Sequence, residues 1–96
     1  ELEGSKRTLE ERLSRPVQKS RMTQSLIENA PATIGGETVV EIRANDGAKY
    51  IMSDDSWLLI RPSGTEPVLR VYAEGRSEGM REALLRYGEQ VAASVT

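Results

Sequence analysis

Two segments in the second half of the chain, residues 57–61 and 68–74, divide into sets of positions that alternate with a period of two. Leu58 and Ile60 alternate with Trp57, Leu59 and Arg61, and Leu69, Val71 and Ala73 alternate with Val68, Arg70, Tyr72 and Glu74. Successive side chains of a strand point to opposite faces, so this period predicts two half-buried strands of an antiparallel sheet. One face of that sheet is expected to be apolar and covered, and the other polar and wet. Arg61 lies where the first strand ends, so its side chain can point into the turn that follows.

A second pair of strands is predicted upstream. Residues 38–43 and 48–52 contain mostly β-forming residues and flank Asn45-Asp46-Gly47. Asp-Gly between such segments is typical of a hairpin. Gly35-Gly36 is predicted to be a turn before these strands, and residues 54–56 a turn after them. The aspartates in both turns are interpreted as turn residues rather than as metal ligands.

The last part of the chain has the period of a helix. Ser77 can cap its first turn, and Glu78 is well placed beside the positive end of the helix dipole. Gly88 interrupts the pattern at a cost of about 1 kcal/mol relative to Ala. The apolar stripe that is predicted to cover the sheet consists of Met80, Ala83, Leu84, Tyr87, Val91, Ala92 and Val95.

Residues 5–15 have the pattern of a short, charged helix. Thr8 and Glu11 have the spacing of a capping box, Leu9 lies on the apolar face, and Pro16 would end the helix. With so little apolar surface to bury, such a helix is marginal by itself. Two interpretations stay open for it: an interdomain hinge, or a solvated tail.

The segment between this helix and the glycine turn is predicted to hold one strand and one helix. Residues 17–22 are read as a first strand, and residues 23–29 as a short helix that ends before Pro31. Together the predicted elements give an α+β fold, with an antiparallel sheet of about four strands and helices packed on one face.

Composition narrows the class of protein. The chain has 96 residues, of which 38% are hydrophobic and none is Phe, so it can form one small domain with a modest aliphatic core. Its net charge of −2 argues against non-specific nucleic-acid binding, and the absence of Cys excludes disulfides and thiolate zinc sites. No apolar run has the length of a membrane span and no signal-peptide pattern opens the chain, so we expect a cytoplasmic protein.

The run Arg61-Pro62-Ser63-Gly64-Thr65-Glu66-Pro67 joins the two alternating strands and suits a phosphate. A guanidinium can give two parallel N–H donors to phosphate oxygens, the two hydroxyls add further donors, and glycine lets backbone amides face an anion. The same residue types also form ordinary turns, in which the Ser and Thr hydroxyls bond to nearby backbone. A carboxylate repels phosphate, so Glu66 is expected to point away or to pair with Arg61 or Arg70.

Residues 56–75, which hold this loop and both flanking strands, resemble the signature of the last domain of the α-D-phosphohexomutases. That family comprises phosphoglucomutase, phosphomannomutase and phosphoglucosamine mutase. The resemblance implies that the loop binds the non-transferred phosphate of a phosphosugar, with Arg61, Ser63, Gly64 and Thr65 as its ligands. It also implies the topology of TATA-box-binding protein. Residues 1–15 would then be a connector or the end of a preceding domain, and residues 16–96 the C-terminal phosphosugar phosphate-binding domain.

The other parts of the family's chemistry are missing from this sequence. A phosphoserine, an aspartate-rich Mg²⁺ loop and a sugar-reading loop come from three preceding domains in the family, whereas this chain has no His and no Asp-x-Asp-x-Asp cluster. No catalytic or metal-binding residue is therefore predicted here, and the chain is expected to be inactive alone. Its start at Glu1 rather than Met fits the expectation of a piece of a longer enzyme.

For that longer enzyme the resemblance implies an isomerase of carbohydrate metabolism. It would be an intramolecular phosphotransferase that works between O1 and O6 of a hexose, with Mg²⁺ and a hexose 1,6-bisphosphate as intermediate or activator. The implied partners are the phosphosugar and the preceding domains, with no nucleic acid and no membrane. The alternative is a stand-alone, non-catalytic module that binds an anion or has only a structural role. The sequence leaves the preferred hexose phosphate open.

Overall fold

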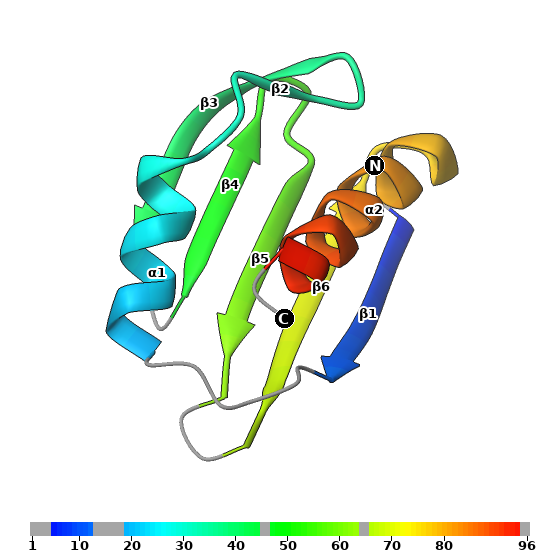
Figure 1. Ribbon diagram of the computed structural model, residues 1–96. Coiled ribbons are helices and arrows are strands. Elements are labelled where there is room, and N and C mark those ends of the chain that lie inside the picture. Colours follow the sequence, from blue (N-terminus) through cyan, green and yellow to red (C-terminus); the bar gives the residue numbers. More distant parts are fainter. Residues whose placement is uncertain (1–4, 13–18, 45–46, 64–65, 95–96) are drawn as a thin grey trace.

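The computed structural model describes residues 5–12, 19–44, 47–63 and 66–94. Over these residues the chain forms one six-stranded sheet with the strand order β1-β6-β5-β4-β3-β2 and two helices (Figure 1). All neighbouring strands run antiparallel. The elements are β1 (Ser5–Arg12), α1 (Lys19–Glu28), β2 (Thr33–Ile34), β3 (Glu37–Ala44), β4 (Ala48–Met52), β5 (Trp57–Pro62), β6 (Val68–Gly75) and α2 (Glu78–Ser94).

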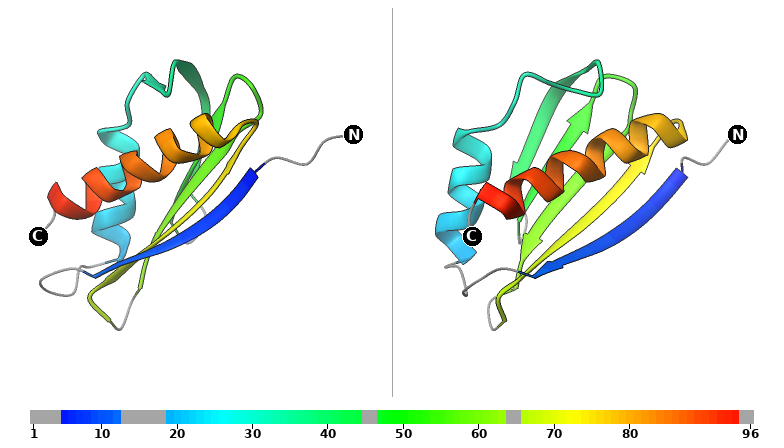
Figure 2. Two further views of the ribbon diagram at one scale, coloured as in Figure 1. Left: turned by 90° about the vertical axis from the view of Figure 1, so that its right-hand side faces the viewer. Right: turned by 45° about the vertical axis from the view of Figure 1, so that its right-hand side comes forward.

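Both helices lie on the same face of the sheet, as the two side views show (Figure 2). Helix α2 packs across β6, β1 and β5, and α1 packs across β3, β4 and β5. The core lies between the helices and the sheet. Its strand residues include Leu58 and Ile60 from β5 and Leu69, Val71 and Ala73 from β6, all fully buried. No described helix covers the opposite face, which we call the open face.

The α+β class and the placement of helices on one face are confirmed, but the estimate of about four strands was too low. The two additional strands are β1 and β2, one at each edge of the sheet. The likeness to the topology of TATA-box-binding protein stays a prediction. Neither described helix is both long and apolar enough to cross a membrane.

The prediction of a helix over residues 5–15 was wrong, because Ser5–Arg12 is strand β1. All eight residues pair with β6, from Ser5 opposite Gly75 to Arg12 opposite Val68. This ladder satisfies backbone groups of an otherwise exposed edge of β6, whereas a helix with so few apolar residues would have gained little. Leu9 packs against the core from this strand. The predicted domain boundary after residue 15 falls within residues 13–18, outside the described part of the chain.

Helix α1 begins earlier than predicted. Lys19–Met22 was assigned to a strand but forms the first turn of this helix, and residues 17 and 18 lie outside the described residues. The predicted helix over 23–29 is correct up to Glu28. Met22 and Leu26, four residues apart on one helix face, are both buried in the core. Positions four apart share a face in a strand as well as in a helix, so this spacing alone does not separate the two conformations; in the fold it is α1 that brings both side chains into the core.

The predicted turns and hairpin are confirmed within the described residues. Gly35 and Gly36 have positive φ angles of 61° and 87° and join β2 to β3. Strands β3 and β4 pair as an antiparallel hairpin with a register irregularity between Val39 and Glu41. Asn45 and Asp46, at the tip of that hairpin, lie outside the described residues.

Helix α2 confirms the predicted cap and most of the predicted stripe. The Ser77 hydroxyl accepts a hydrogen bond from the Met80 backbone N–H at 3.1 Å. The stripe members Met80, Leu84 and Ala92 are buried, and Val95 lies outside the described residues. The stripe missed Leu85, which is also buried, and the half-buried members are Ala83, Tyr87 and Val91.

Gly88, which interrupts the apolar stripe in the sequence, lies at the contact of α2 with the sheet and makes a close approach possible there. A Cβ placed on this glycine would lie 2.6 Å from Val71 Cγ1 and 3.0 Å from Val71 Cγ2. The helix backbone therefore approaches β6 more closely at this point than any side chain would allow.

Candidate functional site

The predicted phosphate loop joins β5 to β6 at the lower end of the sheet in Figure 1. Its base is closed by a hydrogen bond from the Ser63 backbone N–H to the Val68 carbonyl at 3.0 Å. Pro62, directly before it, is fully buried and lies opposite Leu69 of β6. Because Pro62 faces the core, the preceding residue, Arg61, must face the open side of the sheet.

The structure brings two arginines together at this point. Arg61 of β5 is the register partner of Arg70 of β6, so the two side chains leave the open face side by side. Side chains directly opposite each other on neighbouring strands have Cβ atoms about 5 Å apart, and two like charges at such positions destabilise a sheet. An anion lying between the two guanidinium groups would remove this repulsion.

Arg70 has a carboxylate partner on its other side. Its Nη2 lies 3.4 Å from Glu10 Oε2, and the two side chains are 43% and 59% exposed. This ion pair gives Arg70 a carboxylate partner on the neighbouring strand β1. Arg61 is exposed, and within the described residues it has no ion-pair partner. Arg61 is thus the more available of the two cations.

The neighbour of Arg61 on the β4 side is a glycine. Gly47 lies just before Ala48, which pairs with Ile60. A Cβ on Gly47 would collide with the Ile60 carbonyl oxygen and would lie 3.0 Å from the Arg61 Cα. The sequence suggested Gly47 only as a hairpin residue. Its lack of a side chain also allows the close approach of its backbone to the backbone of Ile60 and Arg61.

Ser63 makes a hydrogen bond within the loop. Its Oγ accepts the Glu66 backbone N–H at 3.2 Å. This is the local turn contact that the sequence offered as the alternative to phosphate binding. It uses the oxygen as an acceptor, whereas a phosphate would use the hydroxyl as a donor, and one hydroxyl has both capacities.

Gly64 and Thr65, the other two predicted phosphate ligands, lie outside the described residues. Glu66 is exposed, and in the described part of the chain no ion pair joins it to Arg61 or Arg70. The structure therefore places Arg61 and Ser63 at one end of the sheet and adds Arg70 and Glu10 beside them. Sequence reasoning did not find Glu10, because its segment was read as a helix; a strand reading of residues 5–12 would have placed it on an edge next to β6.

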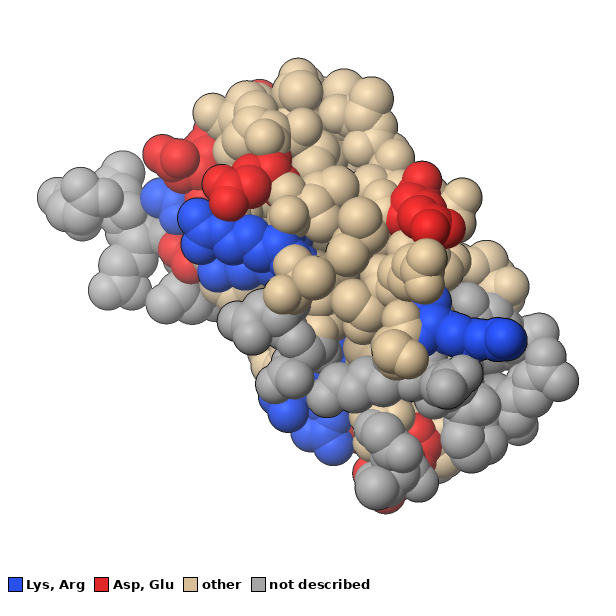
Figure 3. Space-filling model, turned by 90° about the vertical axis from the view of Figure 1, so that its left-hand side faces the viewer, with Lys and Arg blue, Asp and Glu red and all other residues tan. Residues whose placement is uncertain are grey.

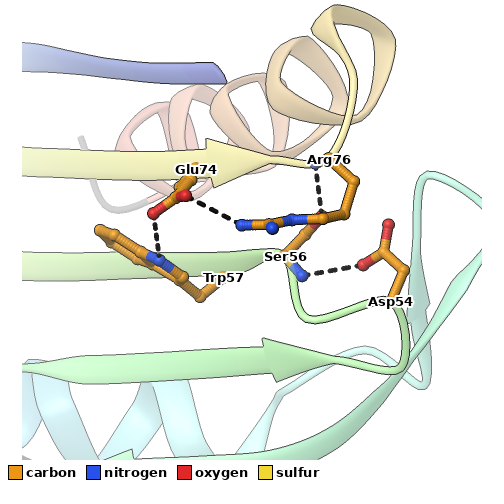
Figure 4. A network of polar contacts seen from close by, with 5 residues as sticks. All are labelled: Asp54, Ser56, Trp57, Glu74 and Arg76. Atoms are coloured by element: carbon orange, nitrogen blue, oxygen red, sulfur yellow. Dashed lines mark hydrogen bonds and ion pairs between the residues drawn. The ribbon is translucent and has the colours of Figure 1, made fainter. Parts of the chain in front are cut away.

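The opposite end of β5 and β6 carries a network of polar contacts (Figure 4). Glu74 accepts hydrogen bonds from Trp57 Nε1 at 3.0 Å and from Arg76 Nη2 at 2.8 Å. The buried Ser56 hydroxyl accepts the Arg76 backbone N–H at 2.9 Å, and the Ser56 N–H donates to Asp54 at 2.9 Å. These bonds fix the turn before β5 to the end of β6.

Trp57 packs on a face of the sheet, and Asp54 has the predicted turn role. Trp57 is half-buried on the open face, with Lys49 Nζ 4.7 Å from its ring centroid. An ammonium group over an indole ring stabilises both side chains. Because one face of the ring is covered in this way, the arrangement is that of a structural contact.

The described residues do not fit a metal site. They contain no group of three or more His, Cys, Asp or Glu side chains that could hold an ion. Figure 3 shows the side of the molecule that is at the left in Figure 1. On this face Lys and Arg side chains lie next to Asp and Glu side chains, and the described residues in view form no continuous basic stripe. A nucleic-acid interface would require such a stripe.

Comparison with protein families gives a match over most of the chain. The family model described as phosphoglucomutase/phosphomannomutase, C-terminal domain, matches residues 18–93. The match includes the β5–β6 loop with Arg61 and Arg70. It excludes strand β1, and with it Glu10.

Curated relatives show the same similarity. A probable phosphoglucosamine mutase of Pyrococcus horikoshii is 35% identical over 77 residues, which are 80% of this chain and 16% of the relative. A phosphopentomutase of Thermococcus kodakarensis is 36% identical over 66 residues, 69% of this chain and 14% of the relative. A phosphoglucomutase/phosphomannomutase of the same organism is 44% identical over 48 residues, 50% of this chain and 10% of the relative. The chain thus spans less than a fifth of the length of these relatives.

Proposed function

The chain belongs to the phosphoglucomutase/phosphomannomutase family as a C-terminal domain, and on that basis we propose that it binds the phosphate of a phosphosugar that is not being transferred. The proposed ligands are Arg61, Ser63, Gly64 and Thr65. The observation that carries the proposal is the pairing of Arg61 with Arg70 on the open face, beside the loop. Two guanidinium groups at neighbouring positions supply forked N–H donors for the oxygens of one phosphate dianion.

The exposed position of Arg61 is consistent with this role. An arginine placed for stability would have a carboxylate neighbour, whereas Arg61 has a second arginine and, at Gly47, no side chain at all. The repulsion between Arg61 and Arg70 is tolerated because both side chains reach solvent. A bound dianion would replace that repulsion with two charge-assisted contacts.

The proposed part of this domain in the reaction is to bind and orient. In an enzyme that moves a phosphoryl group between O1 and O6 of a hexose through a bisphosphorylated sugar, one phosphate must be held while the other reacts. A clamp at the end of β5 would hold the distal phosphate in either orientation of the sugar. Binding energy from such a remote group favours a correctly positioned substrate and a closed site.

The remaining chemistry would come from other parts of a longer enzyme. Mg²⁺ and a phosphoserine belong to the family's reaction, but the described residues of this chain do not fit a metal site, so no step through a metal is assigned to them. The chain alone is proposed to be inactive, and a cytoplasmic location remains our expectation. The names of the relatives include phosphoglucosamine, pentose and hexose mutases, so the proposal specifies the phosphate and not the sugar.

The test is an NMR titration of this chain with glucose 6-phosphate, with glucose as the control ligand. Amide shifts confined to residues 61–66, present with the phosphosugar and absent with glucose, are expected. Binding should be weak, because a single clamp must offset the whole entropy of association. Arg61→Ala should weaken it at least about 10-fold, since a hydrogen bond to a charged group contributes about 1.5–3 kcal/mol. Arg21→Ala, which removes an exposed arginine from α1, is the matched control and should have no effect.

The competing function is a stand-alone module whose loop is only a turn. The hydrogen bond within the loop, from the Glu66 N–H to Ser63 Oγ, is the observation that favours it. If Arg61→Ala and wild type give the same response to glucose 6-phosphate, the phosphate proposal fails and the turn interpretation is retained.

A further inference from the structure

Three charged side chains form a row across three neighbouring strands on the open face. Glu10 of β1 is the register partner of Arg70 of β6, and Arg70 is the register partner of Arg61 of β5. Arg70 therefore lies between the carboxylate of Glu10 and the guanidinium group of Arg61, and Arg61 has no ion-pair partner among the described residues. The order along the row is negative, positive, positive.

We propose that Glu10 is a resting counter-ion of the phosphate site, which holds Arg70 in the absence of ligand and releases it to a phosphate bound between Arg70 and Arg61. Glu10 would then be a positioning residue that sets the affinity of the site for anions. This inference rests on the proposed phosphate-binding function. It concerns a residue outside the range that the family model matches, so it describes this chain's own edge strand.

The Glu10–Arg70 contact is weak enough to be exchanged. Its two atoms lie 3.4 Å apart and both side chains are about half exposed. Exposed ion pairs of this kind contribute little free energy, because solvent screens them and both side chains lose freedom. A phosphate dianion between two guanidinium groups carries twice the charge of the carboxylate and more acceptor atoms, so it competes well for Arg70.

Release of Glu10 would leave strand β1 in place, because the strand is held from its other face. Arg7 Nη1 forms an ion pair with Glu82 of α2 at 3.1 Å, and Leu9 packs against the core. Both side chains alternate with Glu10 and so point toward the helices. The backbone ladder with β6 is also independent of the Glu10 side chain. The exchange thus needs only a side-chain movement.

The decisive experiment compares phosphate binding by Glu10→Gln and Glu41→Gln variants of this chain. Both changes remove one negative charge from an exposed carboxylate that is paired with an arginine on the sheet, and Glu41 pairs with Arg43 on β3, away from the loop. Inorganic phosphate is titrated at constant ionic strength and followed by amide and Arg Nε–H shifts. Glu10→Gln should tighten binding about 2- to 5-fold, and Glu41→Gln should leave it unchanged.

A double-mutant cycle separates an effect through Arg70 from a general one. In an Arg70→Gln background the Glu10→Gln change should no longer alter phosphate affinity, because the residue through which it acts is gone. Glu10→Asp should restore the wild-type affinity in part, since it restores the charge on a shorter side chain. Unchanged thermal unfolding of the Glu10→Gln variant would show that the fold is intact.

Each result decides between the two proposals. If Arg61→Ala abolishes phosphate binding and Glu10→Gln leaves it unchanged or weaker, the role of Glu10 is wrong and the phosphate site stands. If Arg61→Ala does not alter phosphate binding, the site itself is wrong. If Glu10→Gln and Glu41→Gln tighten phosphate binding equally, the effect comes from net charge alone, and this result would also overturn the inference. Absence of saturable phosphate binding by both wild type and Glu10→Gln would overturn both proposals for this chain.

Discussion

Replacing Gly88 with Ala tests the packing of α2 on the sheet, because two effects of known size oppose each other. In a helix interior Ala is about 1 kcal/mol more favourable than Gly. The new Cβ, however, would lie 2.6, 3.0 and 3.3 Å from three atoms of the Val71 side chain. Val71 is fully buried and β-branched, so its side chain has no easy alternative rotamer. Overpacking of this kind costs about 1–3 kcal/mol, so we expect a net loss of about 1 kcal/mol.

The measurement is urea unfolding monitored by circular dichroism. The slope m, which is the dependence of the free energy of unfolding on urea concentration, is compared between variants. A loss of about 1 kcal/mol corresponds to a fall in Tm of about 4–8 °C for a domain of this size. Gly79→Ala is the matched control, since Gly79 lies in the same helix and the nearest atom to its added Cβ is the Ser77 hydroxyl, at 3.9 Å. That variant is expected to be as stable as wild type or slightly more stable.

A Gly88→Ala variant as stable as wild type would refute the reasoning, because α2 would then be able to move away from β6 at no cost. If the clash with Val71 is the cause, the double variant Gly88→Ala/Val71→Ala should show coupling. The methyl group added at position 88 would then partly fill the space left by the valine, and the combined loss would be smaller than the sum of the single losses.

Three further predictions concern charge, capping and catalysis. Burial raises the pKa of the Tyr50 hydroxyl above its ordinary value of 10, so the unfolded chain loses this proton at a lower pH than the folded chain. The free energy of unfolding should therefore be constant below about pH 10 and fall above it, by at most about 1.4 kcal/mol per pH unit for this group. Unfolding curves between pH 8 and 11 check this, and Tyr50→Phe should reduce the slope. Ser77→Ala should cost about 1 kcal/mol in urea unfolding because it removes the cap of α2, and an unchanged midpoint would contradict that role. In a longer mutase that contains this domain, Arg61→Ala should raise KM and lower kcat/KM; steady-state kinetics with an unchanged kcat/KM would reject the assignment.

Local sequence signals predicted much of this domain. The period-two alternation predicted two half-buried strands, which the burial of Leu58, Ile60, Leu69 and Val71 on one face confirms, and Ser77 marked the start of α2. Glycine and aspartate marked the turns. These predictions succeeded because each depends on the geometry of a few consecutive residues: the pleat of a strand, the open N–H groups of a helix end, or a positive φ angle.

Local sequence signals also predicted part of the candidate site. Arg61 and Ser63 were singled out from their chemistry and their position between two strands, and the resemblance to a known family rested on that short stretch. The sequence could not show that Arg61 stands opposite Arg70, because the register between β5 and β6 is a property of the paired strands. Nor did it assign a second role to Gly47, whose contact with Arg61 comes from a neighbouring strand.

Strand β1 shows most clearly what the tertiary structure decided. Taken alone, residues 5–12 have helical spacing and little apolar surface, and either conformation would be marginal in isolation. The free edge of β6 offers a complete ladder of hydrogen bonds, and this partner lies some sixty residues away in sequence, beyond the reach of any local pattern. The chain by itself therefore determined the faces, the caps and the loop chemistry. The packed fold determined which charges share a row, because Glu10, Arg70 and Arg61 become neighbours only when β1, β6 and β5 pair.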